Sequence, residues 1–318
     1  MNNNPPLVSI GLPVYNGENY IEQCISSILS QTYKNIELII SDNASTDNTR
    51  KIVEEFQLND PRIIISVNEI NLGAQLNYDK TVHLAKGSFF KWMAHDDYIY
   101  PTFIEECVNL LLKKPELVYC QSLIEFTDDA LNSIGIHKGM SDQDMHSKSA
   151  HRFRDLILKP HPCMDVFGVF RIQYLGNSLL HGGYPGSDRA YLAEMAMKGP
   201  AGFIDKPLIK IREHDNRYTQ SIFSIKQKLQ WFNTTKKQNI FSPTMALYKD
   251  YMHIIKTHSD SWRTRLQCYS YLIMWWFTNW NAIRVVVDFL DHLFPNFLLK
   301  AEKLKQKFIS PAPRHRYK

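Results

Sequence analysis

Residues 8–49, VSIGLPVYNGENYIEQCISSILSQTYKNIELIISDNASTDNT, decide the fold because they set a helix pattern between two strand patterns. The run at 7–14, LVSIGLPV, is apolar almost throughout, which is typical of a strand buried on both faces. A second such run lies at 35–42, NIELIISD. Between them, apolar residues recur at helical spacing and form one helix face: Ile21, Cys24, Ile25, Ile28 and Leu29.

The same alternation continues to about residue 125. Further strand patterns lie at 62–68, 88–94 and 116–126, and further helix patterns lie at 44–56, 74–85 and 101–114. Strands that alternate with helices predict an α/β fold whose sheet is largely parallel and covered by helices on both faces. In such a sheet, ligands bind beyond the carboxyl ends of the strands.

Polar side chains follow four of these strands, where a parallel sheet would bring them to one edge. They are Pro13, Tyr15 and Asn16, then Asp42 and Asn43, then Asn71 and Gly73, and finally His95, Asp96 and Asp97. Each group alone fits a surface turn. Together they predict a cleft, and the adjacent Asp96 and Asp97 in WMAHDDY (92–98) suggest a divalent-cation site within it.

Two common ways of holding a phosphate are missing from the sequence. No G-x-G-x-x-G follows the first strand, where the chain reads GLPVYNGEN (11–19), and no G-x-x-x-x-G-K-[ST] loop occurs. A dinucleotide-binding dehydrogenase is therefore disfavoured. A cation held by Asp96 and Asp97 would bind diphosphate oxygens instead, and Mg²⁺ or Mn²⁺ suits carboxylate ligands.

The composition indicates the class of protein, the compartment in which it is expected and the partners it is not expected to bind. The 318 residues are 44% hydrophobic and 22% charged, which are ordinary globular values. Five cysteines without CxxC spacing are typical of reduced core residues, and MNNNPPLVSI (1–10) shows no signal-peptide pattern, so a cytoplasmic protein is expected. Residues 300–318 carry seven Lys or Arg and one Glu, whereas the rest carries 30 basic and 31 acidic residues. This neutral body argues against nucleic-acid binding.

The sequence resembles a family 2 glycosyltransferase of the GT-A type. The residues that carry the resemblance are 8–49, NLGAQLNY (71–78) and AKGSFFKWMAHDDYIYPTFIE (85–105), with a weaker likeness over 186–214. The resemblance implies a Rossmann-like GT-A domain at 1–215, divided into a nucleotide-sugar part (1–125) and an acceptor part (126–215). Residues 216–318 would then form a helical C-terminal extension with a basic tail.

The implied activity is an inverting transfer from a nucleotide diphosphate sugar, with a UDP-sugar as the expected donor. The implied acceptor is a hydroxyl of a glycan or lipid-linked glycan in surface polysaccharide biosynthesis. The expected nucleotide-binding residues are Pro13, Tyr15, Asn16, Glu18, Asp42, Asn71 and Asp96. The expected ligands of Mn²⁺ or Mg²⁺ are Asp97, Asp96 and His214, and the expected catalytic base is Asp188. From the residues alone, Asp188 is equally a helix-start carboxylate.

One departure from the family pattern keeps alternatives open. The family commonly shows D-x-D-D, whereas this chain reads Ala94-His95-Asp96-Asp97, so one carboxylate is missing. Asp97 is then the better candidate for the metal, and Asp96 for the ribose. The missing carboxylate also leaves open a non-catalytic nucleotide-sugar or glycan-binding protein. A nucleotidyltransferase is a further alternative, although GLPVYNGENY (11–20) lacks its expected glycine-rich basic loop.

The C-terminal third has a helical pattern rich in aromatic residues. One helix face is expected to hold Tyr248, Tyr251, Met252 and Ile255. CYSYLIMWWFTNWNAI (268–283) is too short and too interrupted to span a membrane, and NFLLKAEKLKQKF (296–308) is amphipathic. These segments predict either peripheral contact with the cytoplasmic face of a membrane or a helical cap on the catalytic domain.

Overall fold

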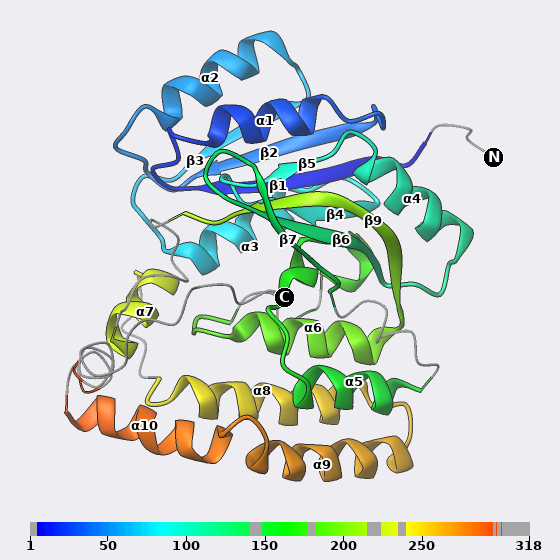
Figure 1. Ribbon diagram of the computed structural model, residues 1–318, viewed down its shortest axis with the longest axis vertical. Helices are drawn as coiled ribbons and strands as arrows, with labels where there is room; N and C mark the ends of the chain where they lie inside the picture. Colours follow the sequence, from blue (N-terminus) through cyan, green and yellow to red (C-terminus); the bar gives the residue numbers. More distant parts are fainter. Residues whose placement is uncertain are drawn as a thin grey trace.

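The strands that the structure describes form one mixed sheet (Figure 1). The structure is a computed structural model, and it describes residues 5–139, 148–176, 178, 182–214, 224–234, 240–294, 297 and 300. Its strands are β1 (Val8–Val14), β2 (Ile36–Asp42), β3 (Ile63–Val67), β4 (Phe89–Trp92), β5 (Tyr98–Ile99), β6 (Tyr119–Thr127), β7 (Ser133–His137), β8 (Val169–Arg171) and β9 (Ala201–Arg212). Their order is β3-β2-β1-β4-β8-β6-β9-β5, and β7 pairs with β6.

The first half of the sheet is parallel, as the sequence predicts. Strand β1 pairs with both β2 and β4, with Val8 opposite Ile36 on one side and Phe89 on the other. Every residue of β1 and β2 is buried, which explains why both read as apolar runs rather than as an alternating pattern. The carboxyl ends of β1, β2 and β4 therefore lie at one edge.

The second half of the sheet is mixed. Strand β8 lies between β4 and β6 and is antiparallel to both, whereas β9 is parallel to β6. The two-residue strand β5 pairs antiparallel with β9 at Tyr98 and Lys210. This pairing joins the segment just after Asp97 to the strand that leads to His214, so two distant parts of the chain meet at the cleft edge.

Helices cover both faces of the sheet (Figure 1). One face is covered by α1 (Ile21–Leu29), α2 (Thr49–Asn59) and α4 (Phe103–Lys113), whose apolar residues share one core with the sheet. On the other face, α3 (Ala74–Leu84) and α6 (Ser187–Lys198) pack against Phe90, Trp92 and Phe170. Strand β4 separates the two cores because its successive side chains point to opposite faces: Phe89 to the first core, Phe90 to the second.

A layer of helices lies beyond α6. It includes α5 (Ser149–Leu158), α8 (Pro243–His258), α9 (Trp262–Phe277) and α10 (Asn281–Leu293). Helix α7 (Ile225–Phe232) contacts both α10 of this layer and α3 on the sheet. Helix α6 is buried along nearly its whole length because it packs on the sheet with one side and on α5 and α8 with the other. The predicted helical C-terminal region is confirmed. The amphipathic segment at 296–308 and the basic tail lie largely outside the described residues.

The face predicted on α8 is only partly buried. Tyr251 and Ile255 are buried in the core of this layer, with Tyr248 packed beside them, whereas Met252 is 39% exposed. The helix turns by about 100° per residue, which puts Met252 at the rim. None of the helices that the structure describes is both long and apolar enough to cross a bilayer.

Candidate functional site

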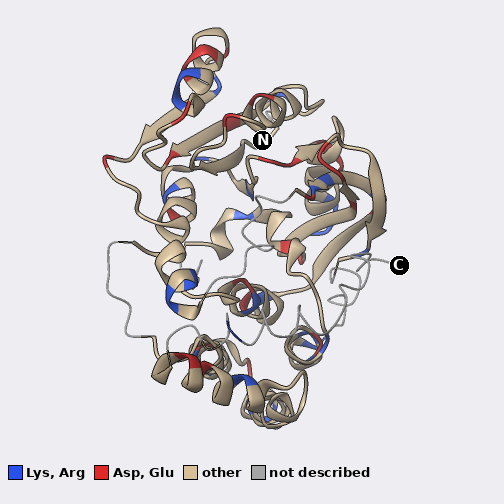
Figure 2. Cartoon of the chain, turned by 60° about the vertical axis from the view of Figure 1, so that its left-hand side comes forward, with Lys and Arg blue, Asp and Glu red and all other residues tan. Residues whose placement is uncertain are grey.

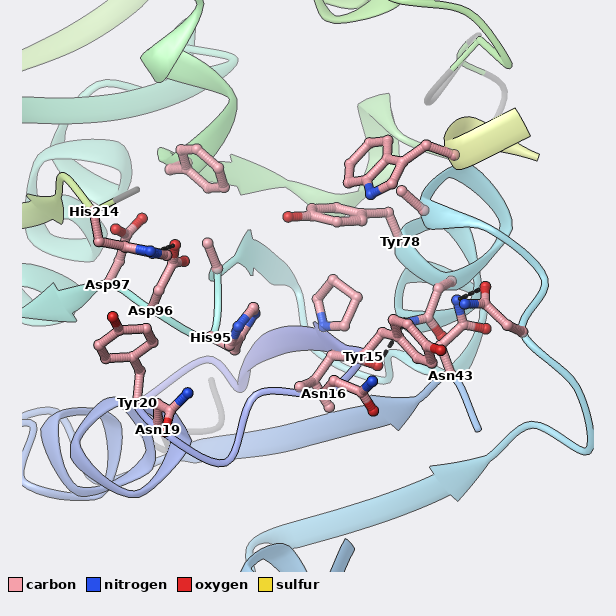
Figure 3. A pocket seen from close by; sticks show the side chains of 18 of the residues that line it. Tyr15, Asn16, Asn19, Tyr20, Asn43, Tyr78, His95, Asp96, Asp97 and His214 are labelled. Atoms are coloured by element: carbon pink, nitrogen blue, oxygen red, sulfur yellow. Dashed lines mark hydrogen bonds and ion pairs between the residues drawn. The ribbon is translucent and has the colours of Figure 1, made fainter. Parts of the chain in front are cut away.

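A cavity of about 520 Å³ opens at the carboxyl ends of β1 and β4 (Figure 3). Its lining comes from the ends of these strands, from α3, from the strand β9 region and from the end of α7. The lining residues are Pro13, Val14, Tyr15, Asn16, Asn19, Tyr20, Asn43, Asn71, Ala74, Asn77, Tyr78, Ala94, His95, Asp96, Asp97, Phe167, Ile211, His214, Trp231 and Thr234. The cleft expected from the four polar strand ends is therefore present.

The cavity has two chemically different ends, as Figure 3 shows. Tyr15, Asn43 and Tyr78 lie toward one end, which is aromatic and rich in amides. Asp96 and His214 lie toward the other, which is acidic and ionisable. His95 lies between the two ends in this view. Such an arrangement suits a long ligand with a flat ring at one end and an anionic group that needs a cation at the other.

Hydrogen bonds fix the loop after β1. Asn16 has a positive φ of 51°, which asparagine tolerates better than most residues. Its backbone N–H donates to Ser45 Oγ at 2.9 Å, and its Oδ1 accepts from the Thr46 N–H at 2.8 Å. Gly17 follows, and a Cβ there would lie 2.6 Å from His95 Cδ2, so only glycine fits. These contacts leave the Tyr15 side chain 44% exposed at the cavity.

An amide cluster fixes the aromatic end of the cavity. Asn43 donates from Nδ2 to Asn71 Oδ1 at 2.9 Å and accepts at Oδ1 from the Leu72 N–H at the same distance. Asn77, which is buried, donates to the carbonyl of Ser41 at 2.9 Å. These amide side chains therefore form hydrogen bonds with backbone groups near the end of β2, and they give this end of the cavity a polar wall of fixed shape.

The acidic end is built from the HDD segment and the strand that faces it. Asp96 Oδ2 lies 3.0 Å from His214 Nε2, and Asp97 Oδ1 accepts the backbone N–H of Arg212 at 3.1 Å. The Tyr20 ring packs on the His214 imidazole with 4.7 Å between centroids. Burial lowers the pKa of His95, which favours its neutral form.

Arg212 holds the residues of the acidic end in place through hydrogen bonds. Its side chain is buried, and it donates to the carbonyls of Asp96, at 3.0 Å, and of Asp129, and to the side chain of Gln23. The guanidinium also lies 4.7 Å from the centre of the Tyr20 ring. Because one cation ties α1, the HDD segment and β9 together, Arg212 fixes where Asp96 and His214 meet.

The Asp96–His214 pair suits a hard divalent cation. Neighbouring ligands around octahedral Mg²⁺ or Mn²⁺, with bonds of about 2.1 Å, lie about 3 Å apart, as these two atoms do. Among the described residues, no cluster of three or more His, Cys, Asp or Glu side chains has metal-site spacing. Mg²⁺ is nevertheless commonly bound through one or two carboxylates, such as Asp96 and Asp97 could supply, and takes its remaining ligands from water and substrate phosphates.

Three expected site residues do not line the cavity in the part of the chain that the structure describes. Glu18 accepts from both the backbone N–H and the side chain of Asn48, at 2.9 and 2.7 Å, at the start of α2. Asp42 is 1% exposed and accepts the Ser45 N–H at 3.0 Å. Both therefore hold the loop that carries Tyr15 and Asn16. The third residue is Asp188.

Asp188 lies in the first turn of α6, as the sequence predicts, after Gly186 with its φ of 88°. It lies beside Cys163, just before the short helix η1 (Met164–Phe167). Burial raises the pKa of the Cys163 thiol, and the charge of Asp188 adds to this shift. Phe167, at the other end of η1, lines the cavity. One short helix therefore separates the candidate base from the cavity wall.

Helix α7 contributes to the cavity, which was not predicted from the sequence. Trp231 and Thr234 line it from this helix and the residues after it. Gly73, with a φ of 87°, lets the two segments meet, because a Cβ there would lie 2.6 Å from the carbonyl oxygen of Phe232. The sequence shows only the aromatic residues Trp231 and Phe232 at the end of a short polar segment. This pattern could not reveal contact with the loop and helix about 160 residues earlier in the chain.

Comparison with known proteins agrees with this geometry. A family model described as "Glycosyl transferase family 2" matches residues 9–174. An uncharacterized glycosyltransferase from Haemophilus influenzae is 30% identical over 241 residues, which cover 74% of each chain. The chain spans only 36%, 36% and 19% of the length of three curated Rickettsia glycosyltransferases that it matches over shorter stretches.

Two solved structures share the fold at low sequence identity. The structure of S. aureus TarS 1-349 in complex with UDP-GlcNAc has a TM-score of 0.62 and 17% identity, covering 92% of this chain and 82% of that one. The mannosyltransferase PcManGT from Pyrobaculum calidifontis, in complex with GDP-Man and Mn²⁺, has a TM-score of 0.51 and 14% identity, covering 96% and 80%. At these identities the likeness concerns the fold.

Proposed function

Because the chain belongs to glycosyl transferase family 2, we propose that it is an inverting glycosyltransferase that uses a nucleotide diphosphate sugar, with a UDP-sugar as the donor. The observation that carries the proposal is the cavity with an aromatic, amide-rich end and an acidic end, at the carboxyl ends of parallel strands. Its size suits a nucleotide sugar, since ligand pockets typically measure about 300–1,000 Å³.

The donor would lie along the cavity with its base at the aromatic end. Tyr15 and Tyr78 offer ring faces there, and Asn43 and Asn71 offer amide groups to the base or ribose. Pro13 and Asn16 would shape the same wall, while Glu18 and Asp42 would act by holding the loops. The fold neighbours bind UDP-GlcNAc and GDP-Man, which supports a nucleotide-sugar donor without selecting the sugar.

The diphosphate would lie at the acidic end, beside Mn²⁺ or Mg²⁺. Asp96 and His214 would hold the ion, because their side chains lie 3.0 Å apart at this end. Asp97, which the sequence favours as the metal ligand, already accepts the Arg212 N–H through Oδ1 and would bind the ion through its other oxygen or through water. When bound, such an ion neutralises the charge that develops on the leaving diphosphate. Ala94 lines the cavity where the family commonly has a further carboxylate, so fewer protein oxygens face the ribose and the ion, and we expect weak metal affinity.

Asp188 would act as the base. In an inverting displacement, the acceptor hydroxyl oxygen attacks the anomeric carbon from the face opposite the diphosphate. Its proton passes to the Asp188 carboxylate, and the sugar–phosphate bond breaks to release the nucleoside diphosphate. General base catalysis of this kind typically contributes about 10²- to 10⁴-fold to the rate.

The proposed acceptor is a hydroxyl of a glycan or lipid-linked glycan in surface polysaccharide biosynthesis. Residues 1–125 would bind the donor, residues 126–215 would bind the acceptor, and residues 216–318 would form the C-terminal extension. The position of Trp231 and Thr234 adds that the extension also completes the donor cavity. An acceptor carried on a lipid would place the protein at the cytoplasmic face of a membrane.

The first test is calorimetric titration of UDP into the protein, with Mn²⁺ and again with EDTA. We expect binding that weakens at least tenfold in EDTA, and the His214→Ala variant should lose most of this difference. His83→Ala removes an exposed histidine on α3 and is the matched control. Equal binding in EDTA would refute the metal site but keep the pocket. Binding of neither UDP nor another nucleoside diphosphate would refute the donor site, and nucleotide binding without transfer would favour the non-catalytic alternative.

A further inference from the structure

Helix α10 has its polar side turned inward. Asn281, Asp288 and Asp291 are 4%, 8% and 5% exposed. The two carboxylates hold the starts of neighbouring helices: Asp288 accepts the Thr244 N–H of α8 at 3.1 Å, and Asp291 accepts the Ile225 N–H of α7 at 3.1 Å. In an ordinary surface helix the apolar side faces the core. Here hydrogen bonds fix the opposite orientation, so the apolar side faces outward.

The outward sides of α9 and α10 carry large apolar residues at helical spacing. On α9 and the turn after it, they are Trp262, Leu266, Ile273, Met274, Phe277 and Trp280, which are between 50% and 85% exposed. On α10 and just beyond it, they are Ile283, Val286, Phe289, Leu293 and Phe294, which are between 43% and 61% exposed. We call these residues the α9–α10 face. Both helices lie in the layer farthest from the sheet (Figure 1).

The exposed charges on α9 and α10 themselves are positive. Between residues 262 and 294 the acidic residues are Asp288 and Asp291, and both are buried. One exposed carboxylate, Asp260, lies just before α9. Arg263, Arg265 and Arg284 are exposed. The sequence from 300 to 318 adds seven Lys or Arg and one Glu. Figure 2 shows acidic and basic residues interspersed over the rest of the described chain.

We propose that the α9–α10 face binds the surface of an anionic lipid bilayer. Exposed apolar groups would enter the interface, tryptophan rings would lie at the level of the headgroups, and Arg263, Arg265 and Arg284 would face lipid phosphates. A second copy of this chain fits less well, because an isologous contact would bring the same arginines together. The inference rests on the proposed membrane location and not on the transfer reaction.

The test is flotation of the full-length protein with vesicles of phosphatidylcholine alone, and of phosphatidylcholine with an equal part of phosphatidylglycerol. We expect binding to the anionic vesicles that falls as salt is raised. Phe277→Glu, at a position 85% exposed, should weaken vesicle binding about tenfold or more. The matched control is Leu58→Glu on α2, at a position 87% exposed on the opposite side of the molecule (Figure 1).

Each outcome either supports or refutes lipid binding by the α9–α10 face. Loss of vesicle binding in Phe277→Glu but not in Leu58→Glu supports the proposal. Absence of binding to either vesicle refutes it, as does binding that Phe277→Glu leaves unchanged. A dimer in sedimentation that Phe277→Glu dissociates, without vesicle binding, would assign the face to a second copy. UDP titration of both variants keeps this result separate from the proposed function, because the substitutions lie outside the donor cavity.

Discussion

Asp188 is the residue on which the proposed chemistry depends most directly. It lies in the first turn of α6, and the packing of this helix on both sides fixes its position. Asp188 itself is half-exposed. We expect Asp188→Asn to reduce kcat by about 10²- to 10⁴-fold, because an amide cannot accept the acceptor proton. UDP affinity should stay within about twofold, since Asp188 does not line the donor cavity in the described structure.

The matched control is Asp205→Asn, which changes an exposed carboxylate on β9 in the same way. Sugar transfer from the donor should be measured alongside donor hydrolysis, because both require a base in the same place. Full activity in Asp188→Asn would show that another group takes the proton. A parallel loss of UDP affinity would instead indicate that the change disturbs the fold around η1.

For individual side chains, the sequence predicts mainly which residues the parallel strands bring to the cavity. Asn71 and Asp96 line one cavity because parallel strands end at one edge, which a pattern of apolar runs is enough to imply. Tyr78 could not be predicted as a cavity residue, because α3 buries polar side chains such as Asn77 and lacks a clear apolar stripe. The organising role of Arg212 was also missed, since its partners include carbonyl groups of distant segments.

Among the helices and strands, the predicted ones are those with a local signal. Strands β1 to β4 and β6 and helices α1, α2 and α4 each show their own period or apolar run, and the structure confirms them. Helix α3 was also predicted and is present, although its apolar pattern is weak. Strands β5 and β7 were not predicted. Strand β5 has two residues, and none of the five residues of β7 is fully buried, so neither strand gives an apolar pattern. Both exist because a neighbouring strand supplies the hydrogen bonds.

Helix α7 offers a test of how an element shapes the cavity. Its first turn is held by Asp291, and its end is joined to the loop after β3 by the Thr234 N–H, which donates to the Leu72 carbonyl at 3.3 Å. We expect Asp291→Ala to destabilise α7 by about 1 kcal/mol, because the Ile225 N–H loses its hydrogen bond while the capping box of Ser224 and Gln227 remains. Amide hydrogen exchange across residues 225–232 should then accelerate about fivefold, and UDP affinity should fall because Trp231 lines the cavity.

Ser261→Ala is the control for that experiment. The Ser261 hydroxyl caps α9 by accepting the Thr264 N–H at 3.1 Å, so the substitution removes a comparable bond from a helix outside the cavity lining. Exchange in α7 and UDP affinity should both remain unchanged in this variant. If Asp291→Ala and Ser261→Ala affect UDP binding equally, the effect would be a general loss of stability and α7 would have no special role.

The molecule as a whole is a stack of layers joined by α6. The sheet carries a core on each face, and a further core lies between α6 and the outer helices. The order of these layers was not predictable from local patterns. Helix α6 is buried all round, so it gives no amphipathic signal, and α10 presents its apolar side outward, so its pattern points the wrong way.

The centre of the sheet contains a buried cation that should make the stability of the whole fold depend on pH. Lys91 on β4 is fully buried, and its Nζ donates to the carbonyls of Phe167 and Trp92, at 2.5 and 3.1 Å. It also lies 4.8 Å from the centre of the Phe103 ring. Burial lowers the pKa of Lys91 from 10.5 to about 8, with neighbouring groups such as Asp97 opposing the shift.

The direction of the effect is set by proton binding. Below pH 8 both the folded and the unfolded chain carry the Lys91 proton, and the buried charge costs about 3 kcal/mol. Between pH 8 and 10.5 only the unfolded chain keeps it, so the contribution of Lys91 to the free energy of unfolding should rise by about that amount.

Urea unfolding of wild type and Lys91→Met at both limits isolates this contribution, because other groups titrate alike in the two proteins. Lys51→Met, at an exposed position on α2, should show no such difference from wild type. A constant difference between wild type and Lys91→Met would mean that the ammonium group keeps its proton in the folded sheet, held by the two carbonyl groups strongly enough to offset its burial.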